Sequence, residues 1–267
     1  MTGDSGFQVD RDAPRHYQDQ VARFMLPLAG SLVARGVKTG DAVLDVACGT
    51  GFATRIAAGS VGSSGRVVGV DINAGMVAFA ESIPHDGTAI SWDVASALDL
   101  PYEDNSFDAV VSQQGVQFFP DIAEGLEEMA RVTRPGGTVS ATVWSGLDDS
   151  PFFAAELAML SEYCGTDPSV YRPAYIEGGP SEMAAWFESA GLESVTVDLL
   201  EPVVSIPPVR DFVPQHLNAL PWSGSFFELD ESIRDEALSI MEDRLSGYTS
   251  ADGLELPFRS YLARATV

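Results

Sequence analysis

An apolar strand runs directly into a glycine-rich turn, Val43-Leu-Asp-Val-Ala-Cys-Gly-Thr-Gly51, and this segment constrains the fold more than any other. Gly49 and Gly51 remove Cβ atoms where a ligand must approach the backbone, and the helix expected next presents free N–H groups. The dinucleotide fingerprint needs a third glycine three residues after the second, where this chain has Thr54. Asp45 would face the two phosphates of a dinucleotide, so its position favours a cationic ligand instead.

A second apolar strand, predicted over residues 67–70, ends at Asp71, which follows Gly49 by 22 residues. In a doubly wound sheet this position faces the ribose of a bound nucleoside, and a carboxylate there accepts hydrogen bonds from both ribose hydroxyls. The alternative is that Asp71 only caps the next helix, a role for which Asn73 is better placed. The spacing therefore favours a ribose-binding role for Asp71.

Apolar runs alternate with helical patterns along most of the chain, which indicates βαβ units and a parallel sheet. We predict strands at residues 42–46, 67–70, 89–92, 107–112, 138–144, 194–199 and 256–265, and helices at 14–35, 52–58, 74–82, 121–133, 181–190 and 232–245. Gly36 is expected to follow the first helix in a left-handed conformation, and Asp121 to cap the fourth helix. Proline-rich sequence after residue 202 marks an inserted cap at 207–247, between the last two strands.

Acidic residues far outnumber basic ones, since 39 Asp and Glu against 15 Lys and Arg give a formal charge of −24. A surface this acidic repels phosphate backbones and anionic lipids, so neither nucleic acid nor membrane is expected as a partner. The N-terminal residues lack a secretory pattern, and no apolar run reaches the roughly 18 residues of a membrane helix. Two cysteines are too few for a disulfide framework, and no cluster has metal-ligand spacing. We expect a cytoplasmic protein without a metal site.

Four segments together resemble the class I S-adenosylmethionine-dependent methyltransferases, in particular the branch that includes the ubiquinone and menaquinone biosynthesis methyltransferases. They are LDVACGTG at 44–51, VVGVDIN at 67–73, DLPYEDNSFDAVV at 99–111 and RVTRPGG at 131–137. The resemblance implies an α/β, Rossmann-like, doubly wound sheet of seven strands, mostly parallel with an antiparallel last strand. We expect one domain made of a helical lid (1–40), a cofactor-binding core (41–200), the acceptor cap (207–247) and a final strand (254–267).

The same resemblance implies S-adenosylmethionine as cofactor and S-adenosylhomocysteine as product. The glycine-rich turn would line the methionine and ribose portions, Asp71 would hold the ribose, and Asp93 with the N–H of Val94 would hold the adenine. Gln113, just past the fourth strand, would lie near the reactive end. The full set of expected cofactor-binding residues is Asp45, Ala47, Gly49, Gly51, Asp71, Ile72, Met76, Asp93, Val94 and Gln113.

The chemistry asks little of the protein, because a sulfonium methyl is already an activated electrophile. Proximity and exclusion of water can suffice, and a general base is needed only for an acceptor that is protonated at neutral pH. The candidate bases are His16 and Tyr17 on the first helix and His216 in the cap, with His216 slightly favoured because imidazole titrates near neutrality. Relatives often carry an aromatic or His-containing run after the fourth strand, where this chain has Gln113-Gln-Gly-Val-Gln-Phe-Phe119. The catalytic group is therefore left unassigned by the resemblance.

Aromatic residues gather after the fourth strand, where this fold places its acceptor. They are Phe118, Phe119, Trp144, Phe152, Phe153, Tyr171, Tyr175, Trp222, Phe226 and Phe227. We expect methyl transfer to a small, largely hydrophobic acceptor at carbon, oxygen or nitrogen, with a homodimer as a further possibility. Two rivals keep the cofactor: an enzyme that uses the sulfonium charge to steer a rearrangement or elimination, and a non-catalytic binding module.

The 24 excess negative charges have two explanations, composition bias and adaptation to high salt. If the habitat is saline, the melting temperature should rise markedly between low and molar sodium chloride, because salt screens the repulsion between surface carboxylates. Thermal denaturation across a salt series tests this. A flat or falling melting temperature leaves composition bias as the explanation.

Overall fold

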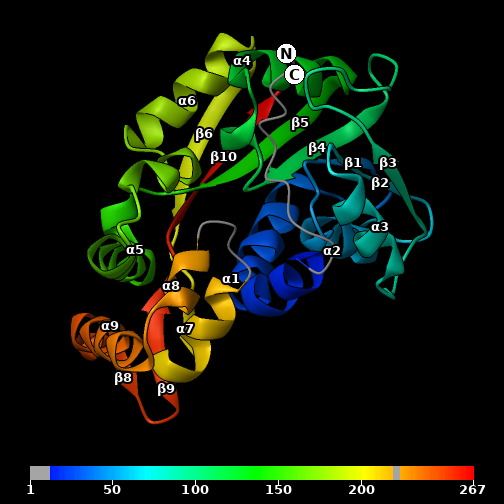
Figure 1. The fold of residues 1–267 in the computed structure, drawn as a ribbon. Coiled ribbons are helices and arrows are strands. Elements are labelled where there is room, and N and C mark those ends of the chain that lie inside the picture. Colours follow the sequence, from blue (N-terminus) through cyan, green and yellow to red (C-terminus); the bar gives the residue numbers. More distant parts are fainter. Residues whose placement is uncertain (1–12, 219–222) are drawn as a thin grey trace, which may run out of the picture.

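Seven strands form one sheet in the order β3-β2-β1-β4-β5-β10-β6 (Figure 1). The computed structural model describes residues 13–218 and 223–267. The strands are β1 (Ala42–Val46), β2 (Arg66–Asp71), β3 (Ile90–Val94), β4 (Phe107–Gln113), β5 (Thr133–Trp144), β6 (Glu193–Leu200) and β10 (Ser260–Thr266). Strands β1 to β5 pair in parallel, whereas β10 runs antiparallel to both β5 and β6. The predicted doubly wound sheet with an antiparallel last strand is confirmed.

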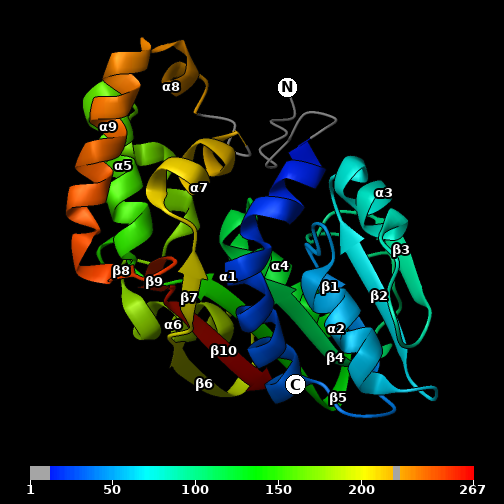
Figure 2. The same ribbon diagram turned by 90° about the horizontal axis from the view of Figure 1, so that it is seen from below.

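Helices cover both faces of this sheet (Figures 1 and 2). One face carries α1 (Ala13–Gly36), α2 (Phe52–Val61) and α3 (Ala74–Ser82), and the other carries α4 (Ile122–Val132) and α6 (Gly179–Ser189). Alternate residues of each strand supply the two cores: Val43 packs with α1 and α2, whereas Leu44 packs with α4 and α6. Within the described part of the chain, no helix has the length and apolar character needed to cross a membrane.

A second, smaller unit lies between β6 and β10. It contains β7 (Val203–Ile206), α7 (Val209–Leu217), α8 (Gly224–Glu228), α9 (Glu231–Arg244), β8 (Thr249–Ser250) and β9 (Gly253–Pro257), with the strand order β7-β9-β8. Helix α5 (Pro151–Cys164), which follows β5, packs against α8 and α9. Short 3₁₀ helices lie at Val116–Phe118, Leu147–Asp149, Pro168–Val170, Arg172–Ala174 and Ser246–Tyr248. The inserted cap is therefore larger than the sequence indicates, and it includes a sheet of its own.

The predicted strand at 256–265 is in fact two strands in two sheets. Pro257 ends β9, since proline has no N–H for the ladder. Phe258 then donates its backbone N–H to the carbonyl of Pro202 and stacks on Phe24 of α1, with ring centroids 4.8 Å apart. The chain thus leaves the small sheet and enters the main one at a buried phenylalanine, an arrangement that alternation of residue types cannot reveal.

Three local predictions can be compared directly with the structure. Asp121 caps α4 as predicted, because its side chain accepts a hydrogen bond from the N–H of Glu124 at 3.0 Å. The prediction that Gly36 is left-handed is wrong, because Gly36 is the last residue of α1 and its φ angle is not positive. A Cβ on Gly36 would lie 3.1 Å from Oγ of Ser140, so the glycine allows the helix end to approach β5. The strand predicted at 138–144 begins earlier in the structure, because β5 also includes residues 133–137.

Candidate active site

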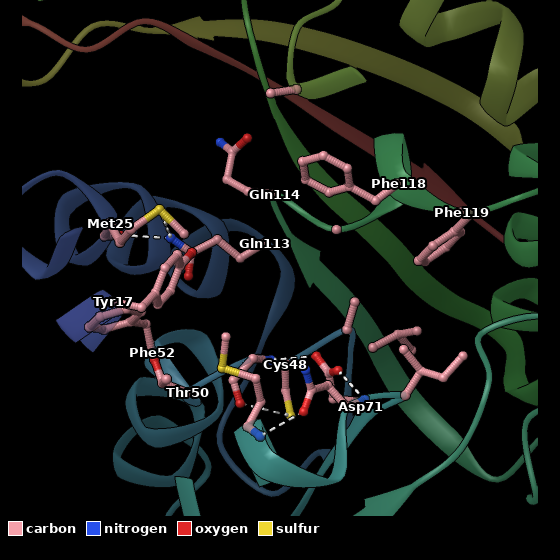
Figure 3. A pocket seen from close by; sticks show the side chains of 18 of the residues that line it. Tyr17, Met25, Cys48, Thr50, Phe52, Asp71, Gln113, Gln114, Phe118 and Phe119 are labelled. Carbon is pink, nitrogen blue, oxygen red and sulfur yellow. Dashed lines mark hydrogen bonds between the residues drawn. The ribbon is translucent and has the colours of Figure 1, made fainter. Parts of the chain in front are cut away.

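A cavity of about 320 Å³ opens at the carboxyl ends of β1, β2 and β4 (Figure 3). One half is lined by the turn at residues 47–50, by 71–73 at the end of β2, and by 95–98 after β3. The other half is lined mainly by aromatic side chains from α1, β5, α5 and the segment 171–175, together with His216 of α7. The strand order reverses between β1 and β4, and open α/β sheets bind their ligands at that point.

The turn after β1 depends on left-handed backbone conformations. Ala47, Gly49 and Gly51 have φ values of 56°, 54° and 82°. A Cβ on Gly49 would meet nothing within 4 Å, so glycine is not required there by a close contact. Glycine instead allows the left-handed conformation and leaves the space in front of the turn open. A Cβ on Gly51 would lie 2.5 Å from the ring of Trp92, so glycine is required there by the close approach of this half-buried ring, and Gly51 does not line the cavity.

Asp71 joins this turn to the end of β2. One carboxylate oxygen accepts the N–H of Gly49 at 2.8 Å, and the other accepts the N–H of Asn73 at 2.8 Å. Burial raises the pKa of Asp71, and the two backbone hydrogen bonds oppose that shift. Each oxygen has a further lone pair available to a ligand hydroxyl. Asn73 caps α3 by accepting the N–H groups of Gly75 and Met76, so Asp71 is not the helix cap.

Six of the ten predicted cofactor residues line the cavity: Ala47, Gly49, Asp71, Ile72, Met76 and Gln113. Asp45, Gly51, Asp93 and Val94 do not. Asp93 accepts a hydrogen bond from the hydroxyl of Tyr102 at 2.9 Å, and Val94 is 54% exposed beside the cavity, where residues 95–98 form the wall instead. Gln113 donates to the carbonyl of Met25 at 2.7 Å and so joins α1 to the end of β4 (Figure 3).

Asp45 is buried beneath the turn. One carboxylate oxygen accepts the hydroxyl of Thr54 at 2.5 Å, and the other has no hydrogen-bond partner among the described residues. Burial, the larger effect, raises the pKa of Asp45 to about 7, although the hydrogen bond from Thr54 opposes the shift. Thr54, which stands where a dinucleotide site has its third glycine, therefore serves to hold this carboxyl group.

A buried pair of titratable side chains lies in the aromatic half. Nε2 of His216 is 3.2 Å from Oε2 of Glu156, and their side chains are 2% and 0% exposed. The hydroxyl of Tyr171 donates to Oε1 of Glu156 at 2.6 Å. The imidazole stacks on Phe212, with centroids 5.6 Å apart, and meets the edge of Phe152 at 5.3 Å. Three elements distant in sequence thus build one polar group inside an apolar wall.

The sequence analysis includes His216 among its candidate bases, and it does not include Glu156, which also lines the cavity. The helix α5 was not predicted, because its first ten residues, PFFAAELAML, are apolar except for Glu156 and show no polar face. That isolated acidic residue is the one signal in the sequence. Among the predicted aromatic residues, Phe118, Phe119, Trp144, Phe153, Tyr171 and Tyr175 line the cavity, Phe152, Phe226 and Phe227 do not, and Trp222 lies outside the described residues.

The other two candidate bases have different positions. Tyr17 faces the half of the cavity near Thr50 and Phe52 (Figure 3). Burial, and secondarily the charge of Asp71, raise the pKa of Tyr17 to about 12, so its phenol stays protonated at neutral pH and is poorly suited to act as a base. The side chain of His16 lies outside the described part of the structure.

Comparison with known proteins identifies the family. The sequence model of the protein family described as "Methyltransferase domain" matches residues 44–141 of this chain. Demethylmenaquinone methyltransferase of Bacillus mycoides is 33% identical over 184 residues, which cover 60% of this chain and 73% of that protein. This chain belongs to the class I S-adenosylmethionine-dependent methyltransferases. Within that family, the 2-phytyl-1,4-naphtoquinone methyltransferase of Trichormus variabilis is 41% identical over 154 residues, covering 51% of this chain and 67% of that protein.

A solved structure supports the fold. Phosphoethanolamine N-methyltransferase 2 of Haemonchus contortus, in complex with S-adenosylhomocysteine, has a TM-score of 0.58 at 19% identity, covering 97% of this chain and 58% of that chain. The methyltransferase described here takes S-adenosylmethionine as its cofactor, and the cavity fits this cation. Among the described residues that line it, two are acidic, Asp71 and Glu156, and none is Lys or Arg.

The raised pKa of Asp45 predicts a pH-dependent cost of folding. Its pKa is about 7 in the folded chain against an ordinary 3.8, so folding favours the protonated form, and stability is lost as the pH rises between these values. Asp45→Asn removes the titration. Relative to wild type, the variant should therefore gain on the order of 3 kcal/mol in free energy of unfolding between about pH 4 and pH 8.

Urea denaturation across that pH range measures the difference. Asp86→Asn, an exposed loop substitution, serves as the matched control and should follow the wild-type curve. A constant difference between Asp45→Asn and wild type would mean that Asp45 does not take up a proton on folding.

Proposed function

We propose that this enzyme transfers the methyl group of S-adenosylmethionine to an aromatic acceptor of the hydroquinone type. The observation that carries the proposal is one continuous cavity with two chemically different halves, a glycine turn with Asp71 on one side and an aromatic wall with buried His216 on the other. Two relatives support the acceptor class, because their names specify demethylmenaquinone and a naphthoquinone.

In the cofactor half, Asp71 would accept hydrogen bonds from the ribose hydroxyls through the lone pairs left free by Gly49 and Asn73. The turn at 47–50 would pass beside the methionine portion, and residues 95–98 beside the base. Ile72 and Val94 lie at the ends of neighbouring strands and are each about half exposed, so they offer apolar surface to a flat ring. When bound, the cofactor supplies a methyl group on a positively charged sulfur.

In the acceptor half, Trp144, Phe153 and Tyr175 would enclose a planar ring and exclude water together with Phe118 and Phe119, two further aromatic residues of the wall (Figure 3 shows Phe118 and Phe119). Burial and the neighbouring carboxylate of Glu156 raise the pKa of Tyr175 well above its ordinary value, so its hydroxyl stays a hydrogen-bond donor. His216 is the base we assign to an acceptor hydroxyl. Acceptor recognition would then belong to α1, α5 and the cap.

Methyl transfer to naphthohydroquinone, kept reduced by dithionite, tests the proposal. We expect S-adenosylhomocysteine and a product heavier than the acceptor by one methyl group in place of a hydrogen. A product of unchanged mass would indicate a rearrangement instead. Absence of turnover with naphthohydroquinone and with a panel of phenols and amines, while the cofactor still binds, would indicate a binding module and would contradict the proposal.

A binding experiment tests the role of Asp71. Asp71→Ala should weaken the affinity for S-adenosylhomocysteine by about 1.5–3 kcal/mol, the range expected when a charge-assisted hydrogen bond is lost. Isothermal titration calorimetry gives the affinity, and the melting temperature shows whether the turn stays folded.

Asp99→Ala provides the control for this variant. Asp99 is an exposed acidic residue directly after the cavity-lining segment 95–98, so its removal changes the net charge equally without touching the turn. Equal affinities of Asp71→Ala and wild type would refute the ribose assignment. Equal losses in the two variants would show that only the net charge matters.

A further inference from the structure

We propose that Glu156 is a positioning residue that fixes the proton of neutral His216 on Nε2, so that Nδ1 accepts the proton of the acceptor hydroxyl. The statement about the acceptor rests on the proposed function, whereas the statement about the imidazole concerns the protein alone. Glu156, His216 and Tyr171 all line the cavity, and Glu156 contacts both of the others there.

The two carboxylate oxygens of Glu156 differ in their hydrogen bonds. Tyr171 donates to Oε1. Oε2 and Nε2 of His216 lie 3.2 Å apart, and neither atom has a hydrogen bond of good geometry within the described residues. A carboxylate only accepts hydrogen bonds, and a buried one needs donors. Nε2 lies within hydrogen-bond distance of Oε2, so a proton there can satisfy this need after a small rotation of the side chains, and we place the proton of the neutral imidazole on Nε2.

Aromatic neighbours hold the imidazole ring of His216 in one orientation. His216 is stacked on Phe212, with an interplanar angle of 16°, and it meets the edges of Phe24 and Phe152 at centroid distances of 6.1 and 5.3 Å. Close packing of this kind resists a flip of the imidazole that would exchange its two nitrogens. The carboxylate of Glu156 therefore faces Nε2 of His216 and not Nδ1.

Nδ1 of His216 is buried and has no hydrogen-bond partner among the described residues. A buried polar atom without a partner calls for an explanation, such as a catalytic role or a bound water. His216 belongs to the cavity wall, and we assign the missing partner of Nδ1 to an acceptor hydroxyl bound in that cavity. This arrangement selects acceptors that carry an O–H group on an aromatic ring.

The proton transfer balances within these groups. The acceptor O–H bond breaks, its proton forms the N–H bond at Nδ1, and the electron pair stays on the acceptor as an oxyanion. The oxygen would then form its bond to the methyl group while the methyl–sulfur bond breaks and leaves its electron pair on sulfur. A ring carbon that attacked instead would afterwards lose its hydrogen as a proton, which restores the aromatic ring. His216 becomes an imidazolium whose positive charge faces the carboxylate of Glu156, and it returns the proton to water when the product leaves. Glu156 keeps its charge throughout.

Nuclear magnetic resonance of the imidazole nitrogens tests the tautomer directly, without any acceptor. The chain has three histidines, so His216→Asn identifies the signals. In the wild type with S-adenosylhomocysteine at about pH 8, we expect His216 to carry its proton on Nε2. In Glu156→Gln the amide carbonyl accepts from Tyr171 and the amide NH₂ donates to Nε2, so the proton should move to Nδ1.

Glu162→Gln is the matched control, because it makes the same substitution at an exposed position of the same helix and should leave the tautomer unchanged. A proton on Nδ1 in the wild type, an imidazolium at that pH, or the same tautomer in wild type and Glu156→Gln would each overturn the proposal. The wild-type spectrum decides the question even if Glu156→Gln does not fold.

Kinetics with naphthohydroquinone add a second readout. Glu156→Gln should lower kcat by about 10²- to 10⁴-fold, as expected for a base held in the wrong tautomer, with KM and cofactor affinity nearly unchanged. Glu156→Asp should recover part of the loss. A raised KM with unchanged kcat would mean that Glu156 binds the acceptor, as it would an amine, and would overturn the proposal. If the wild type does not methylate this probe, the proposed function fails and the tautomer result still stands.

Discussion

The hydrogen bond from the backbone N–H of Gly49 to the carboxylate of Asp71 is the interaction on which the cofactor half depends. Strands β1 and β2 pair in parallel with Val46 opposite Val70, so the turn that leaves β1 meets the first residue past that pair. The carboxylate accepts the N–H of a left-handed glycine and holds the turn open towards the cavity. The short turn, the strand register and one acidic residue therefore have to agree with one another.

Helix α1 connects the two halves of the cavity. Its Tyr17 faces the cofactor half, the carbonyl of Met25 accepts the amide of Gln113, and Phe24 meets His216 and stacks on Phe258. One helix thus contacts the end of β4, the cap and the crossing point between the two sheets. Movement of this helix would alter both halves together, so its packing relates cofactor binding to the shape of the acceptor wall.

The cofactor half could be predicted from sequence because its determinants are local. The turn after β1 and Asp71 lie within one βαβ unit, where a short spacing fixes the geometry. The acceptor half could not, because Glu156 and His216 come from inserted segments and meet only through the packing of α5 against the cap. That Gly51 would not line the cavity could not be predicted for a related reason. Its contact is Trp92 of β3, a side chain that the turn motif itself does not specify.

The placement of the acceptor-side residues has a consequence for how this chain can diverge. Glu156 and His216 lie in helices inserted between strands, so substitutions there leave the register of the seven-stranded sheet unchanged. If these residues recognise the acceptor as we propose, evolution can exchange one acceptor for another by altering α5 and α7, while selection on the methyl donor preserves β1, β2 and the turn between β1 and α2. New acceptors would then be accommodated while the part of the fold that binds the methyl donor stays the same.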